Sequence, residues 1–169
     1  MNENVRARDL MHGNLTEVQV EQPLRDAMAE LIALHDRPDR AKVLVVVDAE
    51  HHYVSVLSAR LLARSLLSHW TPEETHSDEQ MEAAVLAAVR QRLDEPIGAV
   101  LLPDLPHVTP DSRLLDVIEQ SCARKLEYLP VVENGRAVGV VPVTAIFDAT
   151  AALVLRPEDE GIRFDQIDE

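Results

Sequence analysis

The stretch that decides the fold is Leu-Pro-Val-Val-Glu-Asn-Gly-Arg-Ala-Val-Gly-Val-Val, residues 129–141. Two apolar runs flank Asn134 and Gly135, and both of these residues tolerate positive φ angles, so the pattern predicts a β-hairpin. An earlier stretch follows the same plan. Residues 43–47 are a run of Val and Leu typical of a buried strand, and residues 53–57 return after a polar turn. We therefore expect two hairpins.

A helix with the same apolar pattern is predicted before each hairpin. Apolar or small residues recur at i, i+3, i+4, i+7 and i+8, which places them on one helical face. Cys122 falls at the position of Ile32, so we expect it to be a small buried side chain rather than a nucleophile. The two matching sets are Leu24, Ala27, Met28, Leu31 and Ile32, and, 90 residues later, Leu114, Val117, Ile118, Ser121 and Cys122.

A second helix is predicted after each hairpin, over residues 59–68 and 143–155, with Phe147 and Leu153 among its inward residues. Helices and small sheets in this order predict an α/β (α+β) sandwich built from two repeats. Each repeat runs extended segment, helix, hairpin, helix. We divide the chain into repeat 1 (residues 1–70), a linker (71–96), repeat 2 (97–155) and an acidic tail (156–169).

The linker is predicted to contain an inserted amphipathic helix. Residues 71–74 and 77–80 each fit a helix-capping pattern, and apolar residues then recur every fourth position until Pro96. We expect this apolar stripe to pack against the repeats of the same chain, while capping a cleft or joining a dimer interface is the alternative. The acidic tail, with sparse apolar residues, is predicted to be partly disordered.

Composition excludes several classes of function. The 169 residues carry a net charge of −14, which disfavours nucleic acids and anionic membranes. No run of eighteen apolar residues could span a membrane, and the polar first residues do not resemble a signal peptide. Cys122 is the single cysteine, so no intramolecular disulfide can form. We therefore expect a cytoplasmic protein.

With these motifs in order, the chain resembles a pair of CBS domains (cystathionine-β-synthase domains), also called a Bateman module. Residues 5–11 resemble the start of the family's repeat, residues 23–28 its first helix and residues 129–141 its hairpin. The resemblance implies a regulatory module rather than an enzyme. It also implies a pseudo-two-fold pair of repeats, with clefts between them that bind AMP, ADP, ATP or S-adenosylmethionine, and a homodimer formed through the repeats.

The resemblance also assigns site residues. It implies a hydroxyl residue after each hairpin, followed three residues later by an Asp that binds ribose. Here Ser58 is followed by Leu61, whereas Pro142 and Ala145 hold the two positions in repeat 2. We therefore favour the cleft on the Ser58 side, with the expected nucleotide contacts Leu15, Thr16, Ser58, Arg60, Leu105 and Tyr128.

Catalytic and metal chemistry find no support in the sequence. Seven His residues are scattered without metal-binding spacing, and five Gly residues form no phosphate-binding loop. We expect no catalytic residue, no bound metal and no required cofactor. The missing Asp at positions 61 and 145 leaves an alternative, which is a ligand-free scaffold that forms dimers and binds other proteins.

Overall fold

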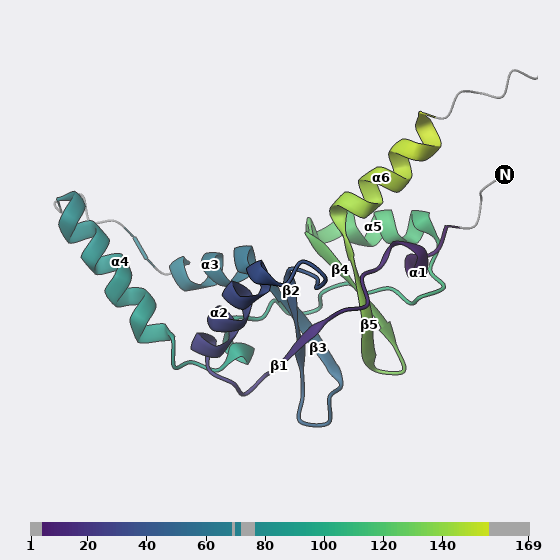
Figure 1. Ribbon diagram of the computed structural model, residues 1–169. Coiled ribbons are helices and arrows are strands. Elements are labelled where there is room, and N and C mark those ends of the chain that lie inside the picture. The colour runs from purple at the N-terminus through teal and green to yellow at the C-terminus, as the bar shows by residue number, and fades with distance from the viewer. Residues whose placement is uncertain (1–4, 69, 72–76, 156–169) are drawn as a thin grey trace, which may run out of the picture.

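The computed structural model describes residues 5–68, 70–71 and 77–155, and it contains two similar helix–hairpin–helix units that lie side by side (Figure 1). The predicted capping pattern at residues 71–74 falls largely outside the described residues, and the acidic tail falls wholly outside them. Within the described part, no helix is long and apolar enough to cross a membrane.

Repeat 1 combines a three-stranded sheet with two helices. Strand β1 pairs in parallel with β2, and β2 pairs antiparallel with β3. The β2–β3 hairpin turns at the polar residues that the sequence predicts. The elements in order are β1 (Thr16–Gln19), α2 (Leu24–Ala33), the 3₁₀ helix η1 (Leu34–Asp36), β2 (Val43–Val47), β3 (Tyr53–Ser58) and α3 (Ala59–Leu67).

Repeat 2 has the same order around a two-stranded sheet. Asn134 and Gly135 form the hairpin turn with φ angles of 51° and 77°, which confirms the role predicted for them. Val108 makes an isolated parallel bridge to Val131 of β4. This bridge corresponds to the parallel pairing of β1 with β2 in repeat 1. The elements are α5 (Leu114–Arg124), β4 (Tyr128–Glu133), β5 (Arg136–Pro142) and α6 (Val143–Val154).

The segment that leads into each repeat packs on the other repeat. Helix α1 (Ala7–Leu10) contributes Ala7 to a core shared with repeat 2. The 3₁₀ helix η2 (Ile97–Val100) contributes Ile97 to the core beneath α2 and α3 of repeat 1. The first residues of repeat 1 therefore complete the core of repeat 2, and the first residues of repeat 2 complete the core of repeat 1.

Backbone hydrogen bonds show this exchange to be symmetric. The N–H of Leu24 donates to the carbonyl of Glu95 at 2.9 Å, and the N–H of Leu114 donates to that of Val5 at 3.2 Å. Both residues of the first bond have their counterparts 90 positions away in the second. Two further bonds repeat with the same offset: Ala7 to Ser112 matches Ile97 to Gln22, and Arg8 to Pro110 matches Gly98 to Val20. The predicted pseudo-two-fold pair is confirmed.

The first strand of the β2–β3 hairpin is buried on both faces. Leu44 and Val46 point toward α2 and α3, whereas Val43, Val45 and Val47 point toward the sheet of repeat 2. This explains why the run is continuously apolar rather than alternating. The second face forms, with repeat 2, a shared core that we call the seam core. Its members in repeat 2 include Val117, Leu129, Val131, Val140 and Val141.

The outer edge of each predicted apolar helix face is exposed. Leu24, Ala27 and Leu31 are buried, but Ile32 is 60% exposed, and Cys122, its counterpart, is exposed as well. The prediction that Cys122 is buried is therefore wrong. Phe147 and Leu153, predicted to point inward, are 70% and 45% exposed. The i, i+3 and i+7 positions are buried and the i+4 positions, Met28 and Ile118, pack half-buried against the core, whereas the i+8 positions lie outside it.

The inserted helix α4 (Asp78–Arg92) lies at one end of the molecule (Figure 1). Ser77 and Gln80 form the predicted capping box. No residue of α4 is fully buried, yet its stripe is half-buried, and the helix contacts α3. Val89 packs against the core of repeat 1, and Arg92 donates a hydrogen bond to the carbonyl of Ser65. The stripe therefore rests on its own chain, as expected.

Candidate functional site

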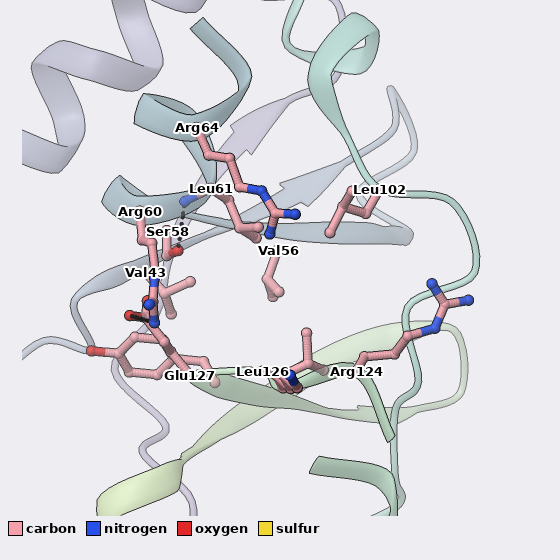
Figure 2. Close-up of a pocket in the computed structure, with 12 residues that line it drawn as sticks. Val43, Val56, Ser58, Arg60, Leu61, Arg64, Leu102, Arg124, Leu126 and Glu127 are labelled. Atoms are coloured by element: carbon pink, nitrogen blue, oxygen red, sulfur yellow. Dashed lines mark hydrogen bonds and ion pairs between the residues drawn. The ribbon is translucent and has the colours of Figure 1, made fainter. Parts of the chain in front are cut away.

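A cavity of about 410 Å³ lies between the two repeats. This volume falls in the range of about 300–1,000 Å³ typical of small-molecule sites. Repeat 1 supplies one wall and repeat 2 the opposite wall (Figure 2). The lining residues are Val43, Val56, Ser58, Arg60, Leu61, Arg64, Leu102, Arg124, Lys125, Leu126, Glu127 and Tyr128.

The wall from repeat 1 is formed where β3 passes directly into α3. The side chain of Ser58 caps this helix, because its Oγ accepts a hydrogen bond of 3.2 Å from the N–H of Leu61. Such a cap stabilises the helix start by about 1 kcal/mol. Arg60 and Arg64 are four residues apart, so they project from the same side of α3. The cap thus sets the position of two cationic side chains beside the cavity.

The wall from repeat 2 is formed by the short turn between α5 and β4. Lys125 ends α5 in the left-handed conformation, with φ 52° and ψ 47°, and its N–H donates to the carbonyls of Ser121 and Cys122. This reversal directs residues 124–128 along the cavity. Burial raises the pKa of the Tyr128 phenol, and the neighbouring Glu127 carboxylate raises it further. Tyr128 therefore offers a neutral hydroxyl and an aromatic face.

One ion pair connects the two walls. The guanidinium of Arg60 lies 3.3 Å from the carboxylate of Glu127 (Figure 2). Their side chains are 75% and 38% exposed, so the pair contributes only about 0–1 kcal/mol to stability. The pair matters for ligand binding, because Glu127, the single carboxylate that lines the cavity, already has a cationic partner.

A second, more open depression of about 440 Å³ adjoins the cavity and shares Ser58, Arg60, Glu127 and Tyr128 with it. Its lining follows the pseudo-two-fold symmetry, since residues at matching positions of the two repeats face each other across it. Lys42 at its edge donates hydrogen bonds to the carbonyls of Leu34 and Arg37. The matching pairs are Lys42 with Glu127, Ser58 with Pro142, Ala59 with Val143, and Arg60 with Thr144.

The structure brings three of the six predicted nucleotide contacts together, because Ser58, Arg60 and Tyr128 all line the cavity. The other three lie elsewhere. Leu105 is buried in the seam core, and Leu15 packs against that core from its edge. Thr16 begins β1, where its hydroxyl lies 3.3 Å from the guanidinium of Arg40.

Sequence reasoning missed three cations that line the cavity: Arg64, Arg124 and Lys125. The first could have been found from its spacing, since Arg64 follows Arg60 by one helical turn. Arg124 and Lys125 carry no such signal. They line the cavity because the pseudo-two-fold axis places the end of α5 opposite α3. The sequence alone does not show that these two segments face each other.

One group of side chains in the described part could approach a metal ion. It consists of Asp48, Glu50 and His52 in the β2–β3 turn, with candidate ligand atoms within 4.8 Å of one another. Asp48, however, accepts hydrogen bonds from the N–H groups of Glu50 and His52 at 2.9 and 2.8 Å. The bond from the His52 N–H is the main cause that lowers the pKa of this carboxyl. Asp48 therefore shapes the turn.

Comparison with known proteins relates repeat 2 to a domain family and the chain as a whole to a known fold. Residues 97–152 match the sequence model of the CBS domain. Over 89% of its length, the chain superposes on 96% of a CBS-domain containing protein from Agrobacterium tumefaciens, with 15% identity and a TM-score of 0.63. Residues 97–152 thus match a CBS domain, and the chain as a whole shares its fold with CBS-domain containing proteins.

Two similar structures were solved with nucleotides. The cytosolic domain of the Mg²⁺ channel MgtE, in complex with ATP, shares 22% identity with a TM-score of 0.61 over 87% of this chain. The chain spans about half of that chain's length, 49%. CBSX2, in complex with AMP, shares 19% identity with a TM-score of 0.61 over 88% of this chain and 98% of its own. No protein with a curated description matches the chain in sequence.

Proposed function

We propose that the protein is a regulatory module that senses an adenosine-type nucleotide in the cleft between its repeats. The observation that carries this proposal is the 410 Å³ cavity, because its walls come from both repeats. A ligand that fills it would contact α3 and the α5–β4 turn together, and so favour one arrangement of the repeats. The fold shared with proteins solved with ATP and AMP supports the proposal.

Thermal unfolding tests this function directly. A ligand that binds only the folded state stabilises it by RT ln(1 + [L]/Kd), about 2.7 kcal/mol at a hundredfold excess over Kd. We expect the melting temperature to rise with at least one of AMP, ADP, ATP and S-adenosylmethionine. Absence of any shift at millimolar concentrations of all four would refute the function. We propose that the module has no catalytic role, requires no cofactor and acts in the cytoplasm.

A second candidate function is a homodimeric interaction scaffold, favoured by the exposed apolar residues of the helices. Leu115 and Phe147 of repeat 2 are 75% and 70% exposed. On repeat 1, α2 and α3 enclose an apolar groove of about 180 Å³, which includes the small side chains of Ala59 and Ala63. Groups of this kind on a soluble surface mark interaction sites.

The dimer is tested by sedimentation. We expect the wild-type chain to be a dimer and Phe147→Ser to dissociate at least tenfold more readily, because the substitution removes the largest exposed apolar side chain of α6. Val54→Ser on the β2–β3 hairpin, where Val54 is 42% exposed, is the matched control and should remain dimeric. A wild-type chain that is monomeric at all concentrations would refute the scaffold.

A further inference from the structure

The cavity between the repeats is strongly cationic. Four basic side chains line it, Arg60, Arg64, Arg124 and Lys125, against the single acid Glu127. Arg60 and Glu127 are paired with each other. Among the described residues, the other three cations have no acidic partner. This excess of positive charge occurs in a chain whose net charge is −14.

The unpaired cations face each other across the cavity. Arg64 extends from α3 and Arg124 from the end of α5, on opposite walls (Figure 2). Both side chains are exposed, so a ligand can reach them. Guanidinium groups bind phosphate oxygens through two parallel hydrogen bonds, and a cleft lined by one sign of charge concentrates its field on the ligand. The arrangement fits a polyanion held between two arginines.

Lys125 occupies its position at a conformational cost. A residue other than glycine in the left-handed region costs about 1 kcal/mol, and glycine is the usual residue at the end of a helix. The chain instead has a lysine at φ 52°, and its side chain lines the cavity. Strained positions of this kind cluster at ligand sites.

The cavity does not offer what a ribose requires. Two vicinal hydroxyls are best bound by a carboxylate that accepts both of their hydrogen bonds. Glu127 is the single carboxylate in the lining, and it is paired with Arg60. Leu61 presents an apolar side chain, and the Oγ of Ser58 already accepts the N–H of Leu61.

Resting on the function proposed above, we infer that the cavity recognises its nucleotide through the polyphosphate and not through the ribose. Affinity should increase with the number of phosphates and be unaffected by removal of the 2′-hydroxyl. A cationic ligand such as S-adenosylmethionine is repelled. The apolar side chains of Val56, Leu61 and Leu102 leave room for the uncharged part of the ligand.

The corresponding positions of the opposite repeat carry less of this charge, because Lys42, which matches Glu127, donates its hydrogen bonds to the carbonyls of Leu34 and Arg37. The pseudo-two-fold axis relates Arg60 and Arg64 to Thr144 and Asp148. It relates Arg124 and Lys125 to Leu34 and His35. The cationic cleft therefore occurs once per chain, and we expect one polyphosphate ligand per chain.

Calorimetric titration in physiological salt tests the inference with ATP, ADP, AMP, adenosine, 2′-deoxy-ATP and S-adenosylmethionine. A hydrogen bond to a charged group is worth about a tenfold change in Kd, so we expect roughly tenfold tighter binding per added phosphate. ATP and 2′-deoxy-ATP should bind equally. Adenosine or S-adenosylmethionine binding as tightly as ATP would overturn the inference while preserving the function, whereas silence from all six refutes the function itself.

Matched variants distinguish the effect of a charge in the cleft from the effect of the same charge elsewhere on the protein. Arg64→Gln and Arg124→Gln should each weaken ATP binding about tenfold, because each removes one bidentate contact to phosphate. Arg90→Gln makes the same charge change on the exposed side of α4 and should alter binding less than twofold. Equal losses in all three variants, or no loss at Arg64 and Arg124, would overturn the inference. Thermal melts of each variant confirm that it is folded.

Discussion

Repeats 1 and 2 have one fold but two chemistries. Their helices start at matching residues, Leu24 and Leu114, and their leading segments exchange hydrogen bonds with the same 90-residue offset. The positions that face the seam nevertheless differ. Where α3 presents Arg60 and Arg64, α6 presents Thr144 and Asp148. The two repeats therefore share their buried frame and differ at exposed positions, and this difference makes one cleft cationic.

The largest expected effect on stability comes from a substitution in the seam core that both repeats share. Leu129 is 1% exposed in the seam core, so Leu129→Ala should lower the free energy of unfolding by about 2–5 kcal/mol. Leu115→Ala, at a position 75% exposed, should change it by less than about 0.5 kcal/mol. Urea unfolding followed by circular dichroism measures both. Because the core belongs to both repeats, we expect one transition, and two separate transitions would contradict the shared core.

A smaller effect tests how the start of the chain is held on repeat 2. A Cβ atom at Gly139 on β5 would lie 2.6 Å from the Sδ of Met11 and 2.9 Å from its Cβ. Gly139→Ala should therefore cost about 1–3 kcal/mol of stability. Gly13→Ala is the control, because the nearest atom to its Cβ would be 3.9 Å away. Similar melting temperatures for the two variants would mean that this segment does not dock as described.

The seam also contains an unpaired hydroxyl contributed by repeat 1. Burial raises the pKa of Tyr53 to about 12, and its hydroxyl has no hydrogen-bond partner among the described residues. Tyr53→Phe should stabilise the protein by about 1 kcal/mol, since a buried unsatisfied group is removed. Differential scanning calorimetry at neutral pH checks the gain. A loss of more than about 1 kcal/mol would show that the hydroxyl has a stabilising partner.

The pH dependence of the wild type follows from the same residue. Above pH 10 an unfolded tyrosine loses its proton, but the folded Tyr53 keeps it until about pH 12. The unfolded state then binds fewer protons, so the stability present below pH 10 is lost as pH rises to 12. Tyr53→Phe should lose less stability than the wild type across this interval. Identical slopes would contradict the raised pKa.

The smallest expected change in stability concerns Lys125 at the end of α5, a cation of the cleft for which repeat 1 has no equivalent. Lys125→Gly should raise stability by about 0.5–1 kcal/mol, because glycine adopts the left-handed conformation without strain, while it weakens ATP binding. Lys125→Gln keeps the strain and removes the charge, so it should weaken binding without stabilising the fold. Thermal melts and titrations measure the two quantities independently. Unchanged ATP affinity in both variants would remove Lys125 from the site.

Most of the frame could be predicted from sequence, because it depends on local patterns. The valine run at residues 43–47, the Asn134–Gly135 turn and the capping box at Ser77 each act through neighbouring residues, and the structure confirms all three. The apolar periodicity also located α2 and α5. It does not give the width of the buried stripe, and Phe147 and Cys122, both predicted to lie inside, are exposed.

The cleft was less accessible to sequence reasoning, because its walls come from segments distant in the chain. The resemblance to the CBS family singles out Ser58, with Arg60 beside it, at the position after the first hairpin. Arg124 and Lys125 could not be singled out, since their role depends on the α5–β4 turn facing α3 across the pseudo-two-fold axis. Repetition predicts that two halves pair, but the charge of the cleft depends on which exposed side chains meet there.

The most direct test of this account is a crystal structure of the protein grown with millimolar ATP. The account predicts one ATP per chain, with its phosphates between Arg64 and Arg124. Phosphates bound instead beside Thr144 and Asp148 would contradict the central claim, as would an empty cavity beside Ser58.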